Sequence, residues 1–95
     1  MPPSDEVEVL YQDTREFDNK IIHIRILSVP KSEKFPEGVK YGLHYGRKGG
    51  DDPIVRYDNH HGVHERHEGD TVEEIPFPGV ETLLRRFQDE VETHR

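Results

Sequence analysis

The spacing of apolar residues changes once along this 95-residue chain, and that change limits the folds open to it. Between residues 6 and 75, apolar and polar residues alternate in short runs separated by turn residues, which is typical of β-strands with two different faces. From residue 80 onward, apolar side chains instead recur every three or four positions, as they do along one side of an α-helix. These helix positions are Val80, Leu83, Leu84, Phe87 and Val91. The two periods predict a run of strands followed by one amphipathic helix.

We predict strands over residues 6–17, 20–29, 39–46, 54–58 and 63–75, and a helix over 79–93. Asp18-Asn19 should form a two-residue hairpin turn, and Gly69-Asp70 should turn the chain into a short extension, Thr71 to Ile75. The predicted fold class is α+β, a single antiparallel meander sheet of about five strands with the C-terminal helix packed on one face. A chain of 95 residues fits one domain, 1–95.

The helix is expected to cover the apolar side chains of the sheet, which are Ile22, Ile24, Ile26, Tyr41, Leu43, Val55 and Tyr57. In the first strand Val7, Val9 and Tyr11 should form a half-buried face.

Composition excludes several classes of protein. The sequence has no cysteine, so disulfides, thiolate metal sites and cysteine nucleophiles are all ruled out. No apolar run approaches the roughly 20 residues of a membrane span, and residues 1–6 lack the pattern of a signal peptide. We therefore expect a cytoplasmic protein with no membrane contact.

The net charge of −7 is unevenly distributed along the chain. Residues 1–19 contain one basic and six acidic residues, residues 68–95 contain three and eight, and residues 20–67 contain nine and six. The middle is therefore basic, and a polyanionic partner is compatible with it. The acidic ends fit either a cytoplasm rich in salt or an ordinary acidic surface.

Histidines concentrate in the segment 56–67, which holds four of the seven in the chain. An antiparallel sheet with one helix leaves its other face open to solvent. By alternation we expect that open face to carry His23, Arg25, Lys40, His44, Arg56, Asp58, His64 and Arg66. For any single one of these residues, simple solubility is a sufficient reason to face outward, but the whole set indicates a site.

Such a set of side chains suits cleavage of RNA without a metal. Imidazoles can act as base and acid, guanidinium groups bind phosphate, and a carboxylate can orient an imidazole. As catalytic candidates we take Arg56, Asp58, His64 and His44. As substrate-binding candidates we take His23, Arg25, Lys40, Asn59, Arg66 and His67, and Tyr41, Tyr45 or Tyr57 could stack a base. No cofactor and no metal are expected for this chemistry.

Two other interpretations remain open. The histidines His60, His61, His64 and His67 could bind zinc or nickel, although neighbours on a strand point to opposite faces. Alternatively, the exposed strands or the helix could dock a protein partner without any catalysis.

Arg56-Tyr57-Asp58-Asn59, followed by the return His64-Glu65-Arg66-His67, resembles the TumE-type toxins of bacterial and archaeal toxin–antitoxin modules. Those proteins typically show R-Y/W-D-N followed by H-x-H, whereas His64 and His67 are three positions apart here. The resemblance implies a toxin whose partner is a cognate antitoxin, with a fold similar to metal-independent ribonucleases. The acidic composition is similar to that of halophilic archaeal members.

Overall fold

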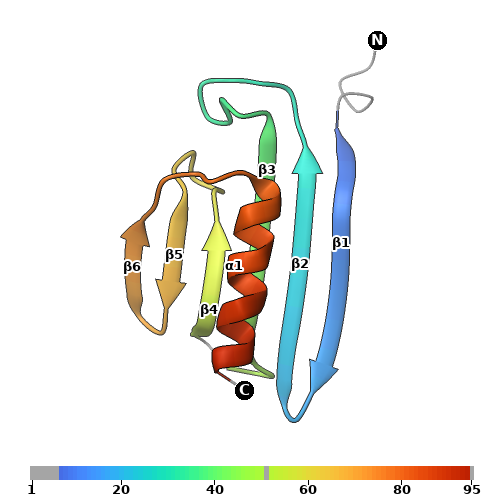
Figure 1. Ribbon diagram of the computed structural model, residues 1–95, viewed down its shortest axis with the longest axis vertical. Helices are drawn as coiled ribbons and strands as arrows, with labels where there is room; N and C mark the ends of the chain where they lie inside the picture. Colours follow the sequence, from blue (N-terminus) through green and yellow to red (C-terminus); the bar gives the residue numbers. More distant parts are fainter. Residues whose placement is uncertain (1–6, 51, 95) are drawn as a thin grey trace.

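The computed structural model describes residues 7–50 and 52–94, which form six strands and one helix (Figure 1). The elements are β1 (Glu8–Phe17), β2 (Lys20–Ser28), β3 (Val39–Arg47), β4 (Pro53–Asp58), β5 (Glu65–Glu68), β6 (Thr71–Glu74) and α1 (Val80–Thr93). Each strand pairs antiparallel with the next one in the chain. The predicted α+β meander is confirmed. The predicted start of the first strand at residue 6 lies outside the described residues.

Turn residues determine where the strands reverse. Asp18 and Asn19 both have positive φ, 48° and 66°, as a tight two-residue hairpin with matching twist requires. Gly69 also has positive φ, 60°, and joins β5 to β6. The predicted turn at Gly69-Asp70 is therefore confirmed, and it divides the predicted segment 63–75 into two short antiparallel strands, β5 and β6.

The helix packs on the face of the sheet formed by β3 and β4 (Figure 1). Its buried residues Leu83, Phe87 and Val91 are spaced four apart, so they share one side of α1. The ring of Phe87 meets that of Tyr57 edge to face, with centroids 6.2 Å apart. The buried apolar residues of the sheet are Ile24, Ile26, Val39, Tyr41, Leu43, Tyr45, Val55 and Tyr57. Within the described part of the chain, no helix is long and apolar enough to cross a membrane.

Glu90 connects the helix to the sheet by accepting hydrogen bonds from Arg66 and from the Tyr57 hydroxyl. Burial alone would raise the pKa of Glu90, but the bonds from Arg66 and Tyr57 and the charges of Arg66 and Arg86 lower it overall. The same carboxylate raises the pKa of Arg66. Arg66 therefore lies on the helix side of the sheet, and its predicted place on the open face is wrong. The cause is register, because Arg66 pairs with the core residue Tyr57.

The first strand is more exposed than predicted. Val9 retains 51% and Tyr11 38% of their accessible surface, and Val7 and Leu10 are exposed too. A bulge between Val9 and Tyr11 interrupts the alternation of β1. The predicted half-buried face is wrong here because α1 packs over β3 and β4 and leaves β1 without a cover.

Candidate functional site

Direct cross-strand pairing arranges the open face in two rows. The first row runs across β2, β3, β4 and β5 through His23, His44, Arg56 and His67. The second row runs through Arg25, Gly42, Asp58 and Glu65. Directly paired residues of neighbouring strands point to the same side of a sheet. The predicted placement of His23, Arg25, His44 and Arg56 opposite the helix is therefore confirmed.

A hollow of about 540 Å³ opens over the middle of this face. Its lining residues are His23, Arg25, Leu27, Lys40, Tyr41, Gly42, His44, Arg56 and His60. Three of them carry a fixed positive charge and none carries a carboxylate. In a protein with a net charge of −7, this surface is a local concentration of positive charge.

Two glycines of β3 give imidazole rings room to lie against the sheet. A Cβ atom on Gly46 would come within 2.8 Å of Nε2 of His44, and one on Gly42 within 3.1 Å of Nε2 of His60. Real Cβ contacts are rarely that close, so both rings depend on the missing side chains. Gly42 thus forms part of the lining of the hollow, and Gly46 leaves room for the ring of His44, which lines it.

Both of these imidazoles have a lowered pKa. For His44 the causes are burial, then the positive charge of Arg56 and the proximity of His23. For His60 burial is again the largest cause, and it outweighs the opposing effect of Asp58. Each ring is therefore neutral near pH 7 and has a nitrogen lone pair that can accept a proton.

Asp58 is the buried carboxylate of the open face, with a side chain only 6% exposed. Its Oδ2 atom accepts a hydrogen bond from Nε of Arg56 at 2.9 Å and lies 3.2 Å from Nε2 of His67. The backbone N–H of His60 approaches its Oδ1 atom at 3.4 Å. Asp58 therefore orients the guanidinium at the edge of the hollow.

His64 lies away from the open face, contrary to its predicted position. Its ring stacks on Phe77 with centroids 4.6 Å apart, and its Nδ1 atom is 2.8 Å from the hydroxyl of Tyr41. Nε2 lies 3.2 Å from a carboxylate oxygen of Glu37, and only 11% of the side chain is exposed. The chain turns at residues 60–61 and enters β5 only at Glu65, so alternation does not extend back to His64.

Asn59 is also absent from the open face. It is 1% exposed, its Oδ1 atom accepts the backbone N–H of Tyr41, and its Nδ2 atom donates to the carbonyl of Val39. The amide thus joins the residue after β4 to β3, and its burial keeps it from contacting a substrate. The tyrosines considered for base stacking, Tyr41, Tyr45 and Tyr57, are buried as well.

Two residues of the open face were missed from the sequence. His60 falls between the predicted strands 54–58 and 63–75, where alternation gives no facing, yet its ring lies over Gly42. Glu65 shares the open face with His67 because they are two positions apart on β5. The signal in the sequence is the pair of glycines in β3, Gly42 and Gly46, four positions apart. They leave space on the sheet for the rings of His60 and His44.

The fold and this face define a small α+β protein with a cationic, histidine-bearing sheet surface. Residues 4–95 match the family described as toxin TumE, and because the match covers nearly the whole chain, the protein belongs to that family. Membership in a toxin family implies a cognate antitoxin as partner. The comparisons with curated proteins and with solved structures gave no significant match.

Proposed function

We propose that the protein is an RNA-directed toxin whose hollow on the open face binds and cleaves single-stranded RNA without a metal. The observation that carries the proposal is the hollow itself, in which imidazoles and three fixed cations line one surface of an acidic protein. A polyanion is attracted to such a surface, and its phosphates match the guanidinium groups of Arg25 and Arg56. Membership of a toxin family agrees with an activity that stops growth.

The chemistry follows from the state of each group. Neutral His44 takes the proton of the ribose 2′-hydroxyl, whose oxygen then attacks the adjacent phosphorus. The bond from phosphorus to the 5′-oxygen breaks, and that oxygen receives a proton from His23, which also lines the hollow. The products are a 2′,3′-cyclic phosphate and a 5′-hydroxyl. Only RNA carries the attacking hydroxyl, so DNA is not a substrate.

The cations stabilise the charge that builds up on the phosphorane. Arg56 is held by Asp58 at the border of the hollow, so its fork is oriented before substrate arrives. Lys40 and Arg25 extend the positive surface along β3 and β2 and bind neighbouring phosphates. His64 has no role in this proposal because its ring faces away from the hollow.

The test is cleavage of single-stranded RNA oligonucleotides by the purified protein, together with growth inhibition in cells. His44→Gln should reduce cleavage by roughly 100-fold or more, as loss of a general base does. Arg56→Lys should also reduce it, because lysine keeps the charge but loses the bidentate fork. EDTA should leave the rate unchanged.

His94→Gln is the matched control, since His94 caps the end of α1 and lies outside the hollow. It should retain the full rate. Full activity in His44→Gln, or loss of activity on adding EDTA, would contradict metal-independent cleavage in the hollow.

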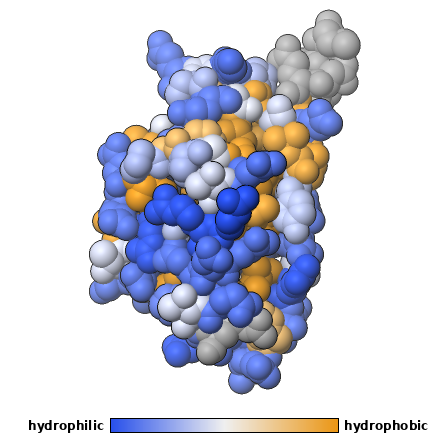
Figure 2. All heavy atoms as spheres, viewed as in Figure 1, coloured by the Kyte–Doolittle hydropathy of each residue, from blue (hydrophilic) through white to orange (hydrophobic). Residues whose placement is uncertain are grey.

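A second candidate function, docking of the antitoxin, is favoured by the surface beside the helix. A groove of about 430 Å³ lies between α1 and the exposed part of β1 and β2, with Tyr11, Phe17 and Ile22 on its floor. Figure 2 shows hydrophobic surface in this region. Arg15 pairs with Asp13 on the strand side, while Asp89 and Glu92 border the groove on the helix side, so the segment that fits is apolar with basic residues toward α1.

Tyr11→Asp should weaken co-purification with the antitoxin, because it places a charge on the apolar floor of the groove. Val72→Asp is the matched control, as Val72 is also an exposed apolar residue but lies on β6 at the opposite edge of the sheet. Equal loss of binding in both variants would exclude the groove as the docking site.

A further inference from the structure

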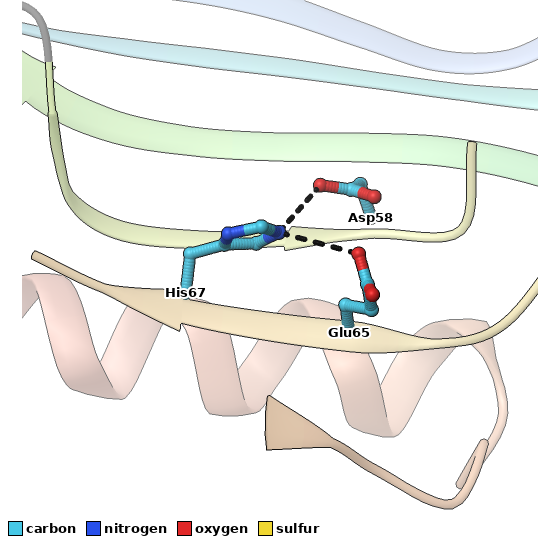
Figure 3. Close-up of side chains that lie close together, drawn as sticks. All are labelled: Asp58, Glu65 and His67. Atoms are coloured by element: carbon cyan, nitrogen blue, oxygen red, sulfur yellow. Dashed lines mark ion pairs between the residues drawn. The ribbon is translucent and has the colours of Figure 1, made fainter. Parts of the chain in front are cut away.

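A second cluster of polar side chains lies on the open face, outside the hollow. It is at the β4 and β5 end of the two rows described above. Asp58 from β4 and Glu65 and His67 from β5 point toward one another (Figure 3). Asp58 pairs directly with Glu65, and His67 pairs with Arg56 next to them. Two neighbouring strands thus present three ligand-type side chains on a rigid backbone.

The spacing of their atoms matches the coordination shell of a metal ion. Nε2 of His67 lies 3.2 Å from Oδ2 of Asp58 and 3.6 Å from Oε1 of Glu65. Ligands bound at about 2.1 Å in tetrahedral or octahedral geometry are roughly 3.0–3.5 Å apart. One atom from each of the three side chains lies within 4.8 Å of the other two. Among residues 7–50 and 52–94, this is the only such group, so the four histidines considered from sequence do not form one.

His67 supplies an independent indication of a ligand. Its Nε2 atom is buried and makes no hydrogen bond of acceptable geometry within the described structure, although a carboxylate oxygen lies 3.2 Å away. A buried nitrogen in that state is costly unless its lone pair or its proton is used. Coordination of a cation between the two carboxylates would use it.

We propose that Asp58, Glu65 and His67 bind a divalent first-row transition-metal ion. One imidazole with two carboxylates suits Zn²⁺ or Mn²⁺, whereas Mg²⁺ and Ca²⁺ prefer oxygen ligands alone. The two carboxylates balance the ionic charge. The metal site shares Asp58 with the hollow, where that carboxylate orients Arg56, but metal binding does not require RNA to be the substrate.

Arg56 competes with the ion, because its Nε atom already donates to Oδ2 of Asp58 at 2.9 Å. Binding of a metal must therefore release Arg56 from that oxygen or share the carboxylate with it. Removal of the Arg56 charge should strengthen metal binding. A variant that merely damaged the structure would bind the metal more weakly. Stronger binding on removal of the Arg56 charge therefore distinguishes a true ligand site from a general loss of structure.

The experiment is calorimetric titration of the metal-free protein with ZnCl₂, repeated with MgCl₂. We expect one equivalent of Zn²⁺ to bind and Mg²⁺ to bind at least 10-fold more weakly. His67→Gln and Glu65→Gln should each weaken Zn²⁺ binding by 10-fold or more, and Arg56→Met should strengthen it.

His61→Gln serves as the control, because His61 is exposed and belongs to the same histidine-rich segment without being in the trio. It should bind as the wild type does. The proposal is overturned if the wild type does not bind Zn²⁺, or if His61→Gln loses binding while His67→Gln keeps it. RNA cleavage that persists in EDTA would leave this result unaffected.

Discussion

Gly42 and Gly46 lie in β3 directly beneath the rings of His60 and His44, and the hollow depends on the space they leave. The clashing atoms are the far ends of histidine side chains, which can rotate away. A methyl group at either position should therefore move a ring without unfolding the sheet. The hollow would change shape while the core, on the other side of β3, stays packed.

We predict that Gly46→Ala displaces His44 and that Gly42→Ala displaces His60. The free energy of unfolding should change by less than about 1 kcal/mol, because alanine also restricts the unfolded chain. Histidine ring signals in NMR spectra check this, and each variant is the control for the other. If Gly46→Ala leaves the His44 signal unchanged, the ring does not lie over that glycine.

The lowered pKa of His44 predicts a pH dependence. Burial and Arg56 hold the pKa of the folded state below the ordinary value of about 6.5, so the unfolded chain binds the proton more readily. The contribution of His44 to stability is present above that value and is lost as pH falls through the folded-state pKa. NMR titration should show the low pKa, and Arg56→Gln should raise it. Arg85→Gln, on the exposed side of the helix, should leave it unchanged.

At the scale of elements, His64 contacts three separate segments of the chain and holds them together. Its contacts join the 29–38 loop through Glu37, β3 through Tyr41, and the segment before the helix through Phe77. Its carbonyl also accepts the N–H of Ile75 at 2.8 Å. His64 therefore has a structural position where the sequence suggested a catalytic one.

His64→Gln should lower the free energy of unfolding by about 1–2 kcal/mol, because it loses the stacking on Phe77 and the bond to Tyr41. Chemical denaturation measures this. His61→Gln, an exposed neighbour, should change it by less than about 0.5 kcal/mol. A loss of RNA cleavage in a fully stable His64→Gln would instead restore the catalytic role that the sequence suggested.

The elements were predictable because each one has a clear period and clear turn residues. Alternation also placed His23, Arg25, His44 and Arg56 correctly, since β2 and β3 pair without interruption and the register shift between β3 and β4 comes only after Tyr45. It failed at His64 and Arg66, where a turn of unpredictable length sets the register of β5. The burial of Asn59 was not predictable either, because its partners lie 18 and 20 positions away.

At the scale of the whole molecule, an excess of seven negative charges surrounds a small core. Mutual repulsion of the exposed carboxylates destabilises the folded state. Salt screens this repulsion, because the Debye length falls from about 10 Å at 0.1 M to about 3 Å at 1 M. We predict that the free energy of unfolding increases by roughly 1 kcal/mol between 0.1 M and 1 M KCl. RNA binding should weaken over the same range, because salt also screens attraction to phosphates.

Denaturation at several KCl concentrations checks the stability effect. The variant Asp70→Asn, Glu74→Gln removes two exposed carboxylates and should show a smaller increase with salt. A stability that falls with salt would mean that attractive ion pairs, such as Arg66 with Glu90, outweigh the repulsion.

The helix follows all six strands in the chain, and this order has a consequence for protein synthesis. Each strand meets its neighbour as soon as it leaves the ribosome, so the meander assembles from local contacts. Its apolar face stays uncovered until residues 80–93 are translated, and the backbone beneath His44 and Arg56 has no support before then. The hollow proposed to act on RNA and the groove proposed to bind the antitoxin therefore both depend on the translation of α1, since α1 supports the sheet and forms one wall of the groove.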